Sequence, residues 1–151
     1  MDSTDHRILG LLQSNARVAA SDIARKLELV PSAIHQRIKK LEERGVIRGY
    51  TTRIDPPAID RGLVAFVHLR TDERLGDPSV AEAVGTLPEV LEVHDIAGED
   101  CYLLKVRVAD TAALHALLRE GIAEIDSVVA TRTTIVMKTF KETSELPIPT
   151  D

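Results

Sequence analysis

Residues 27–50 read LELVPSAIHQRIKKLEERGVIRGY, and this stretch predicts a surface helix with a clear start and end. Pro31 suits the first helical position, because its ring fixes φ and the N–H that it lacks would have no partner there. Gly45 suits the left-handed residue that ends a helix. The apolar residues between them recur at steps of four and three and form one stripe: Ile34, Ile38 and Leu41. One face of this helix is therefore expected to pack against the protein, while the other faces outward.

The outward face carries hydroxyl, imidazole, amide and ammonium groups, which suit base edges and phosphates in a major groove. We expect base-edge contacts from Ser32, His35 and Gln36, and phosphate contacts from Lys39, Lys40 and Arg48. Arg37 lies nearer the apolar stripe. For this residue, pairing with an acidic residue of the fold and contact with DNA are equally good expectations. The alternative for this stretch alone is a solvated amphipathic helix, because Lys and Glu are ordinary on exposed faces.

The composition is typical of a soluble globular protein, with 44% hydrophobic and 28% charged residues among 151. This length allows one domain of ordinary size or two small ones. No apolar run approaches the roughly 18 residues of a membrane span, so we expect a cytoplasmic protein without a membrane partner. The single cysteine, Cys101, cannot form an internal disulfide and is expected to be a packing residue.

The charge is distributed unevenly along the chain. Residues 1–54 contain ten Lys or Arg and six Asp or Glu, a net charge of +4, whereas the remainder contains nine and eighteen, a net charge of −9. Such a split indicates a basic module suited to a polyanion, joined to an acidic module with a different task.

The sequence carries no recognisable catalytic, metal-binding or cofactor motif. Its five histidines are scattered without metal-ligand spacing, and there is no glycine-rich phosphate loop, nucleophile elbow or HExxH. We therefore expect no catalytic residues, no metal site and no cofactor.

The basic part predicts two helices before the one described above, at about residues 3–15 and 20–27. Asp2 followed by Asp5 resembles a helix cap, and a polar break precedes the second helix. Two helices joined by a short turn, the second with a polar outer face, make a helix-turn-helix. The β-rich run at 46–54 indicates a strand or small wing. We therefore expect a DNA-binding domain at residues 1–54.

A linker at residues 55–62, marked by Asp55-Pro56-Pro57, is expected to lead to a second domain at 63–140. The pattern there is strand, helix, strand, strand, helix, strand: Leu63–Thr71, Pro78–Leu87, Val90–Ala97, Tyr102–Val108, Asp110–Glu120 and Val128–Met137. This order is the βαββαβ, or ferredoxin-like, plan of an α+β fold. Its two helices cover one face of the sheet, so the other face must find cover elsewhere, which favours a dimer. Residues 141–151 form an extended tail that either docks or stays loose.

A helix-turn-helix followed by a ferredoxin-like domain resembles the Lrp/AsnC family of transcriptional regulators, the leucine-responsive or feast-famine regulatory proteins. Four stretches carry the resemblance: 5–9 (DHRIL), 37–42 (RIKKLE), 45–50 (GVIRGY) and 98–106 (GEDCYLLKV). The resemblance implies a regulator of double-stranded DNA, built from homodimers that often assemble into octamers. It also implies that a small effector, commonly an amino acid, binds to the second domain at contacts between dimers.

Several positions depart from the family pattern. Ala19 and Val30 replace residues that usually cap the two helices of the motif, and Glu28 stands where Gly or Asn is frequent. In the turn between the two middle strands, Gly98 is kept, but Cys101 takes the position usual for Asp, and Asp100 precedes it.

The same turn is the candidate effector site: Gly98, Glu99, Asp100 and Cys101. Its backbone N–H groups can bind a carboxylate, and Asp100 can meet an α-amino group. The alternative is a tight hairpin with a surface acid. The alternative for the whole chain is a stand-alone metabolite-sensing or enzyme-regulatory ferredoxin-like module, which leaves the basic helix-turn-helix unexplained.

Overall fold

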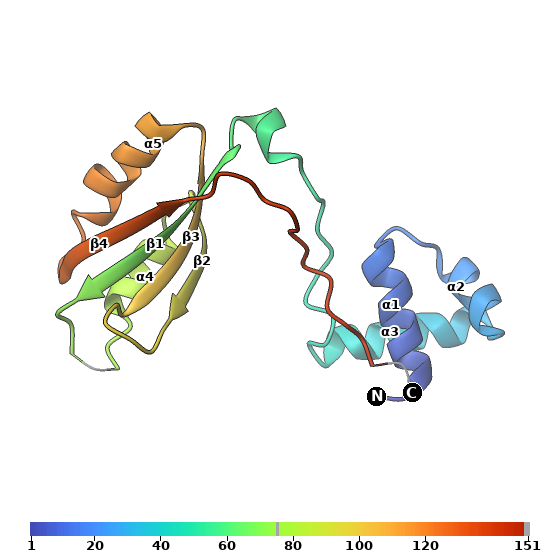
Figure 1. Ribbon diagram of the computed structural model, residues 1–151. Helices are drawn as coiled ribbons and strands as arrows, with labels where there is room; N and C mark the ends of the chain where they lie inside the picture. Colours follow the sequence, from blue (N-terminus) through green and yellow to red (C-terminus); the bar gives the residue numbers. More distant parts are fainter. Residues whose placement is uncertain (75, 150–151) are drawn as a thin grey trace. The chain divides into compact units, whose positions relative to one another are not determined.

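The chain forms two compact units in the computed structural model, which describes residues 1–74 and 76–149 (Figure 1). The helical unit consists of residues 1–53 together with the tail from residue 141, and the sheet unit consists of residues 54–140. Leu75 and the last two positions of the expected tail, Thr150 and Asp151, lie outside the described residues.

Three helices build the helical unit: α1 Ser3–Ser14, α2 Ala20–Leu27 and α3 Pro31–Glu43. Helix α1 starts with a capping box, in which the Asp2 carboxylate accepts from the Asp5 N–H at 2.8 Å and Asp5 accepts from the Asp2 N–H at 3.1 Å. Buried aliphatic residues from all three helices form the core: Ile8, Leu12, Ile23, Ala24, Ile34 and Leu41. The apolar stripe expected on α3 therefore does face the interior.

The segment after α3 corrects one expectation. Gly45 ends the helix with φ of 67°, as expected, and the N–H groups of Val46 and Ile47 return to the carbonyl of Leu41. Residues 46–54, however, contain no strand. Of the two alternatives expected here, a strand or a small wing, the strand is not formed, because a strand needs a hydrogen-bonded neighbouring strand and this segment has none among the described residues.

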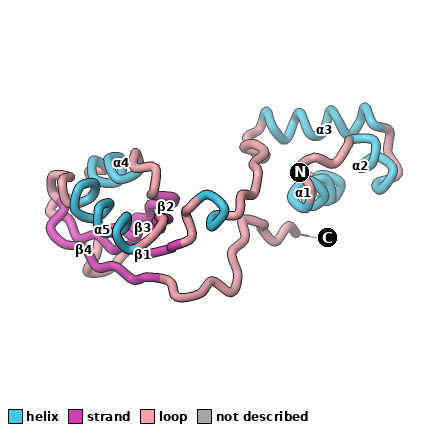
Figure 2. Tube along the Cα trace, turned by 90° about the horizontal axis from the view of Figure 1, so that it is seen from above, coloured by secondary structure: helices cyan, strands magenta, loops and turns pink. Residues whose placement is uncertain are grey.

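The sheet unit contains four strands and two helices in the βαββαβ order (Figure 2). Its elements are β1 Leu63–Thr71, α4 Ser79–Gly85, β2 Val90–Asp95, β3 Tyr102–Val108, α5 Thr111–Ala116 and β4 Val128–Ile135. A π-helical turn, η2 Leu117–Ile122, continues α5, and a 3₁₀ turn, η1 Pro56–Ile59, lies in the expected linker. The strands lie in the order β2-β3-β1-β4 with every neighbour antiparallel, which is the ferredoxin-like arrangement.

Both helices of this unit pack on the same face of the sheet. Alternate residues of β1 and β3 are buried against them, including Val67, Leu69, Leu104 and Val106. The intervening residues lie on the face without helices. None of the helices in the described parts of the chain combines the length and apolarity needed to span a bilayer.

Candidate functional site

The outer face of α3 presents the residues expected to contact nucleic acid. The side chains of Ser32, His35, Gln36, Lys39 and Lys40 are all exposed, as is Arg48 just beyond the helix. Lys39 has an acidic neighbour one turn along, since its Nζ lies 3.6 Å from the Glu43 carboxylate. Both side chains are largely exposed, so this pair is weak and leaves Lys39 free to rearrange.

Arg37 pairs with acidic residues of the fold, which was one of the two roles expected for it. Its Nη1 donates to the carboxylates of Asp2 and Asp5, at 2.7 Å in each case. The N–H of Asp5 and the guanidinium of Arg37 hold the pKa of Asp2 below its usual value. This contact joins the N-terminal turn of α1 to the middle of α3, and so fixes the orientation of the helix that carries the candidate interface.

The two motif helices begin without side-chain caps. Neither Ala19 before α2 nor Val30 before α3 has a side chain that accepts a hydrogen bond from the helix. Glu28, which ends α2, adopts the left-handed conformation with φ of 57° and ψ of 41°. The turn thus keeps the geometry that Gly or Asn adopts more easily, in spite of the substitution.

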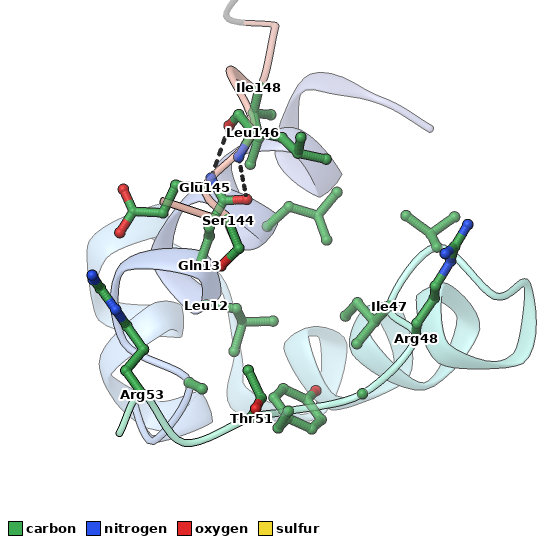
Figure 3. Close-up of a pocket in the computed structure, with 15 residues that line it drawn as sticks. Leu12, Gln13, Ile47, Arg48, Thr51, Arg53, Ser144, Glu145, Leu146 and Ile148 are labelled. Atoms are coloured by element: carbon green, nitrogen blue, oxygen red, sulfur yellow. Dashed lines mark hydrogen bonds between the residues drawn. The ribbon is translucent and has the colours of Figure 1, made fainter. Parts of the chain in front are cut away.

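The C-terminal tail docks, which was one of the two expectations for it, but sequence reasoning did not predict where it binds (Figure 3). A cavity of about 360 Å³ in the helical unit is lined by α1, by the segment after α3 and by tail residues including Leu146 and Ile148. The side chain of Gln13 holds the tail there, donating from Nε2 to the Leu146 carbonyl at 2.8 Å and accepting from the Leu146 N–H at 3.0 Å. The only sequence signal was two aliphatic residues, Leu146 and Ile148, that alternate with Pro147 and Pro149.

The turn between β2 and β3 offers backbone donors, but fewer than expected. The N–H of Cys101 donates to the Leu69 carbonyl at 2.7 Å, so it is engaged within the sheet. The N–H groups of Gly98, Glu99 and Asp100 donate no hydrogen bond to any residue within 1–74 and 76–149. These three groups are therefore the donors that remain for an anion.

The carboxylate of Asp100 already has a cationic partner. Its Oδ2 accepts a hydrogen bond from Arg132 Nη2 at 2.5 Å, and His68 Nδ1 lies 3.3 Å from Oδ2 without making a hydrogen bond. The hydrogen bond from Arg132 is the main reason why the pKa of Asp100 lies below its usual value. The turn is thereby tied to β1 and β4 on the face of the sheet that carries no helices.

That face is partly apolar. Phe66 and Leu103 are half-buried on neighbouring strands, and Phe66 lies opposite Lys105 in the β1–β3 register. Lys105 in turn donates to Glu92 of β2 at 3.2 Å. A mixed apolar and charged surface on an uncovered sheet face is suited to burial against another protein surface.

Comparison with known proteins identifies the chain. The family model of the Lrp/AsnC ligand-binding domain matches residues 64–146, and that of a winged helix-turn-helix DNA-binding domain matches residues 1–48. The chain belongs to the Lrp/AsnC family. It is therefore a DNA-binding transcriptional regulator with a winged helix-turn-helix domain and an α+β ligand-binding domain, as the resemblance predicted.

Individual Lrp/AsnC proteins match along nearly the whole chain. The leucine-responsive regulatory protein of Escherichia coli (strain K12) is 35% identical over 99% of this chain and 93% of its own length. The crystal structure of an AsnC family regulator from Agrobacterium tumefaciens has a TM-score of 0.91 and 35% identity, covering 97% of each chain. A transcriptional regulator from Neisseria meningitidis, solved in complex with L-methionine, has a TM-score of 0.90 and 30% identity, covering 97% of this chain and 96% of that one.

Membership of the Lrp/AsnC family excludes the stand-alone sensing module as a description of this chain, because the DNA-binding model covers all of α1, α2 and α3. The ligand-binding model includes both the turn at 98–101 and the docked residue Leu146. Family membership therefore assigns tasks to both units but does not assign individual contact residues.

Proposed function

We propose that this Lrp/AsnC regulator recognises specific operators by placing α3 in the major groove of double-stranded DNA. Ser32, His35 and Gln36 meet base edges, while Lys39, Lys40 and Arg48 neutralise phosphates. The exposure of all six side chains supports this assignment. Arg37 is not among them because its guanidinium is paired with acidic residues of the fold. It also accounts for the net charge of +4 on residues 1–54 of a chain whose total charge is −5.

The regulator acts as a homodimer that can assemble further, up to an octamer. The helix-free face of the sheet, with Phe66 and Leu103, supports pairing because it would otherwise leave apolar surface in water. A symmetric pair presents two copies of α3, which requires two half-sites separated by about one helical turn or a multiple of it. Binding to chromosomal DNA places the regulator in the cytoplasm, and its function needs no catalytic step.

The effector is an amino acid bound at the turn between β2 and β3. The free N–H groups of Gly98, Glu99 and Asp100 receive its carboxylate, and the Asp100 carboxylate receives its α-amino group in competition with Arg132. The L-methionine complex of the Neisseria regulator supports this ligand class. The effector changes assembly or DNA affinity, provided that it binds the two states with different affinities.

The DNA proposal is tested with genomic fragments selected by the purified full-length protein. Gel shifts at low and moderate salt are expected to show tighter binding to selected fragments than to random DNA, and footprints are expected to show paired half-sites. Equal, weak binding to all fragments would refute operator recognition. Sedimentation that shows only monomers would refute the pairing.

The effector proposal is tested by calorimetry with a panel of the standard amino acids. At least one amino acid is expected to bind, and Asp100→Asn is expected to weaken it several-fold. Asp126→Asn, an exposed acid in a different loop, serves as the matched control and is expected to bind normally. Absence of heat with every amino acid would count against this effector class.

A further inference from the structure

Val30 is an apolar side chain left in solvent directly in front of α3. Its exposed fraction is 62%, compared with 39% for the neighbouring Leu29, and no other large apolar side chain within residues 1–53 is as exposed. The branched aliphatic residues of the three helices are all buried in one core or packed against it. Val30 is therefore not a core residue.

The side chain of Val30 also has no role in starting the helix. The backbone carbonyl of Val30 accepts from the N–H groups of Ala33 at 3.0 Å and Ile34 at 3.3 Å, while the side chain makes no capping bond. Pro31, the first residue of α3, has no backbone N–H, so the first turn has one donor fewer for a cap to satisfy. Local structure would be served better by Ser, Thr, Asp or Asn at this position, since each of these can accept from the first turn.

Val30 lies at the end of α3 where a helix-turn-helix protein contacts the edges of the bases. In helix-turn-helix proteins the N-terminal residues of the second helix contact base edges, and Val30 lies two residues before Ser32. The major-groove edges of the bases carry a single apolar group, the C5-methyl of thymine. Three further exposed side chains at this end of α3, Ser32, His35 and Gln36, are polar and suit the donors and acceptors of the bases.

We propose that Val30 reads the C5-methyl group of a thymine in each half-site of the operator. This inference rests on the proposed function, since it requires α3 to enter the major groove. Cytosine and deoxyuridine lack the methyl group, so each leaves Val30 without an apolar partner. Burial of one methyl group corresponds to about a four-fold change in affinity per half-site, and to about fifteen-fold when both half-sites of a dimer lose it.

The test is a double-mutant cycle between protein and DNA. In a selected operator, each thymine is replaced in turn by deoxyuridine, which removes only the methyl group, and binding is measured by gel shift. The wild type is expected to lose about four-fold at one thymine per half-site, whereas Val30→Ser is expected to bind both DNAs equally. Val30→Ser is also expected to unfold at the same temperature or a higher one, because Ser caps helices well. A loss of discrimination in that variant cannot then be a folding defect.

Val129→Ser is the matched control, because Val129 is 55% exposed and lies in β4 of the sheet unit. Its ratio of affinities for the two DNAs is expected to equal that of the wild type, even if its overall affinity changes. Retention of the thymine preference by Val30→Ser overturns the assignment to Val30, and so does a wild type that is insensitive to every replacement. A wild type that binds no operator specifically refutes the proposed function itself, which distinguishes the two failures.

Discussion

The side-chain amide of Gln13 matches the backbone of Leu146 on both sides, donating to its carbonyl at 2.8 Å and accepting from its N–H at 3.0 Å. The two residues are 133 positions apart in the sequence. A primary amide carries the same donor and acceptor as a peptide group, so Gln13 pairs with the tail as a neighbouring strand would. Leu146 of the tail is thereby fixed to the helical unit, whereas the strand that precedes the tail, β4, belongs to the sheet unit.

Replacement of Gln13 by Ala is expected to release the tail. Loss of two hydrogen bonds, each contributing about 1 kcal/mol net, should weaken docking by about 2 kcal/mol. Hydrogen exchange at the Leu146 amide is expected to accelerate strongly. Ser14→Ala is the control, because the Ser14 hydroxyl donates to the Gly10 carbonyl of its own helix and not to the described part of the tail. Unchanged protection of Leu146 in the Gln13 variant would show that the apolar contacts of the tail suffice.

Glu28→Gly is expected to stabilise the helical unit. Glu28 adopts left-handed φ and ψ, which cost a side-chain-bearing residue about 1 kcal/mol or more, whereas Gly takes them without strain. The thermal midpoint should rise by a few degrees in a calorimetric scan. Lys26→Gly, a change within the regular part of α2, is expected to lower it by a similar amount. A fall of the midpoint for Glu28→Gly would mean that this turn is not strained.

The helical unit was predictable from sequence because its signals are local. Pro31, Gly45 and the spacing of the apolar residues fixed α3 to within a residue. The place of Arg37 beside the apolar stripe made an acid pair one of two expectations, and the structure shows that pair. The ferredoxin-like order was predictable for the same reason, since each strand and helix carries its own periodicity.

The errors and omissions arise where a partner far along the chain decides the structure. The segment 46–54 has strand-forming residues but no strand beside it, and the N–H of Cys101 is taken by Leu69 of another strand. Gln13 gives no sign in the sequence that it will bind residue 146. Such contacts depend on tertiary packing, which periodicity and spacing do not encode.

The phenol of Tyr102 is expected to lose its proton at an unusually high pH. Its OH donates to Glu73 at 2.5 Å, and this bond, followed by burial, raises the pKa of Tyr102 to about 12. Because the pKa of Tyr102 is higher in the folded than in the unfolded chain, the protonated phenol stabilises the fold. This stabilisation is complete below the ordinary pKa of about 10 and is lost as the pH rises through about 12.

Ultraviolet absorbance of phenolate can measure this titration in a Tyr50→Phe background, which leaves one tyrosine. Glu73→Gln is expected to move the pKa of Tyr102 back toward 10, because it removes the negative charge. Glu42→Gln, which changes the partner of Tyr50, should leave the titration of Tyr102 where it was. An unshifted pKa in the Glu73 variant would contradict the assigned cause.

Lys39→Ala is expected to weaken binding to all DNA sequences alike. Lys39 is assigned to a phosphate, so its loss should lower the slope of log affinity against log salt by about one and leave base preference intact. The measurement is a salt titration of binding to an operator and to random DNA. Lys138→Ala, an exposed lysine in the sheet unit, is the control and should keep the wild-type slope. A change confined to one DNA sequence would instead make Lys39 a reader of bases.

Gln36→Ala is expected to have the opposite effect, a local loss of specificity. An amide can bind the N6 and N7 groups of adenine with two hydrogen bonds, so its removal should relax discrimination at one base pair by about 1 to 3 kcal/mol. The salt slope should not change, because no phosphate contact is lost. A selection of operators with the variant, compared with one made with the wild type, locates the relaxed position. If the two selections agree at every position, Gln36 does not contact a base edge, and the groove is read by the remaining residues at the start of α3.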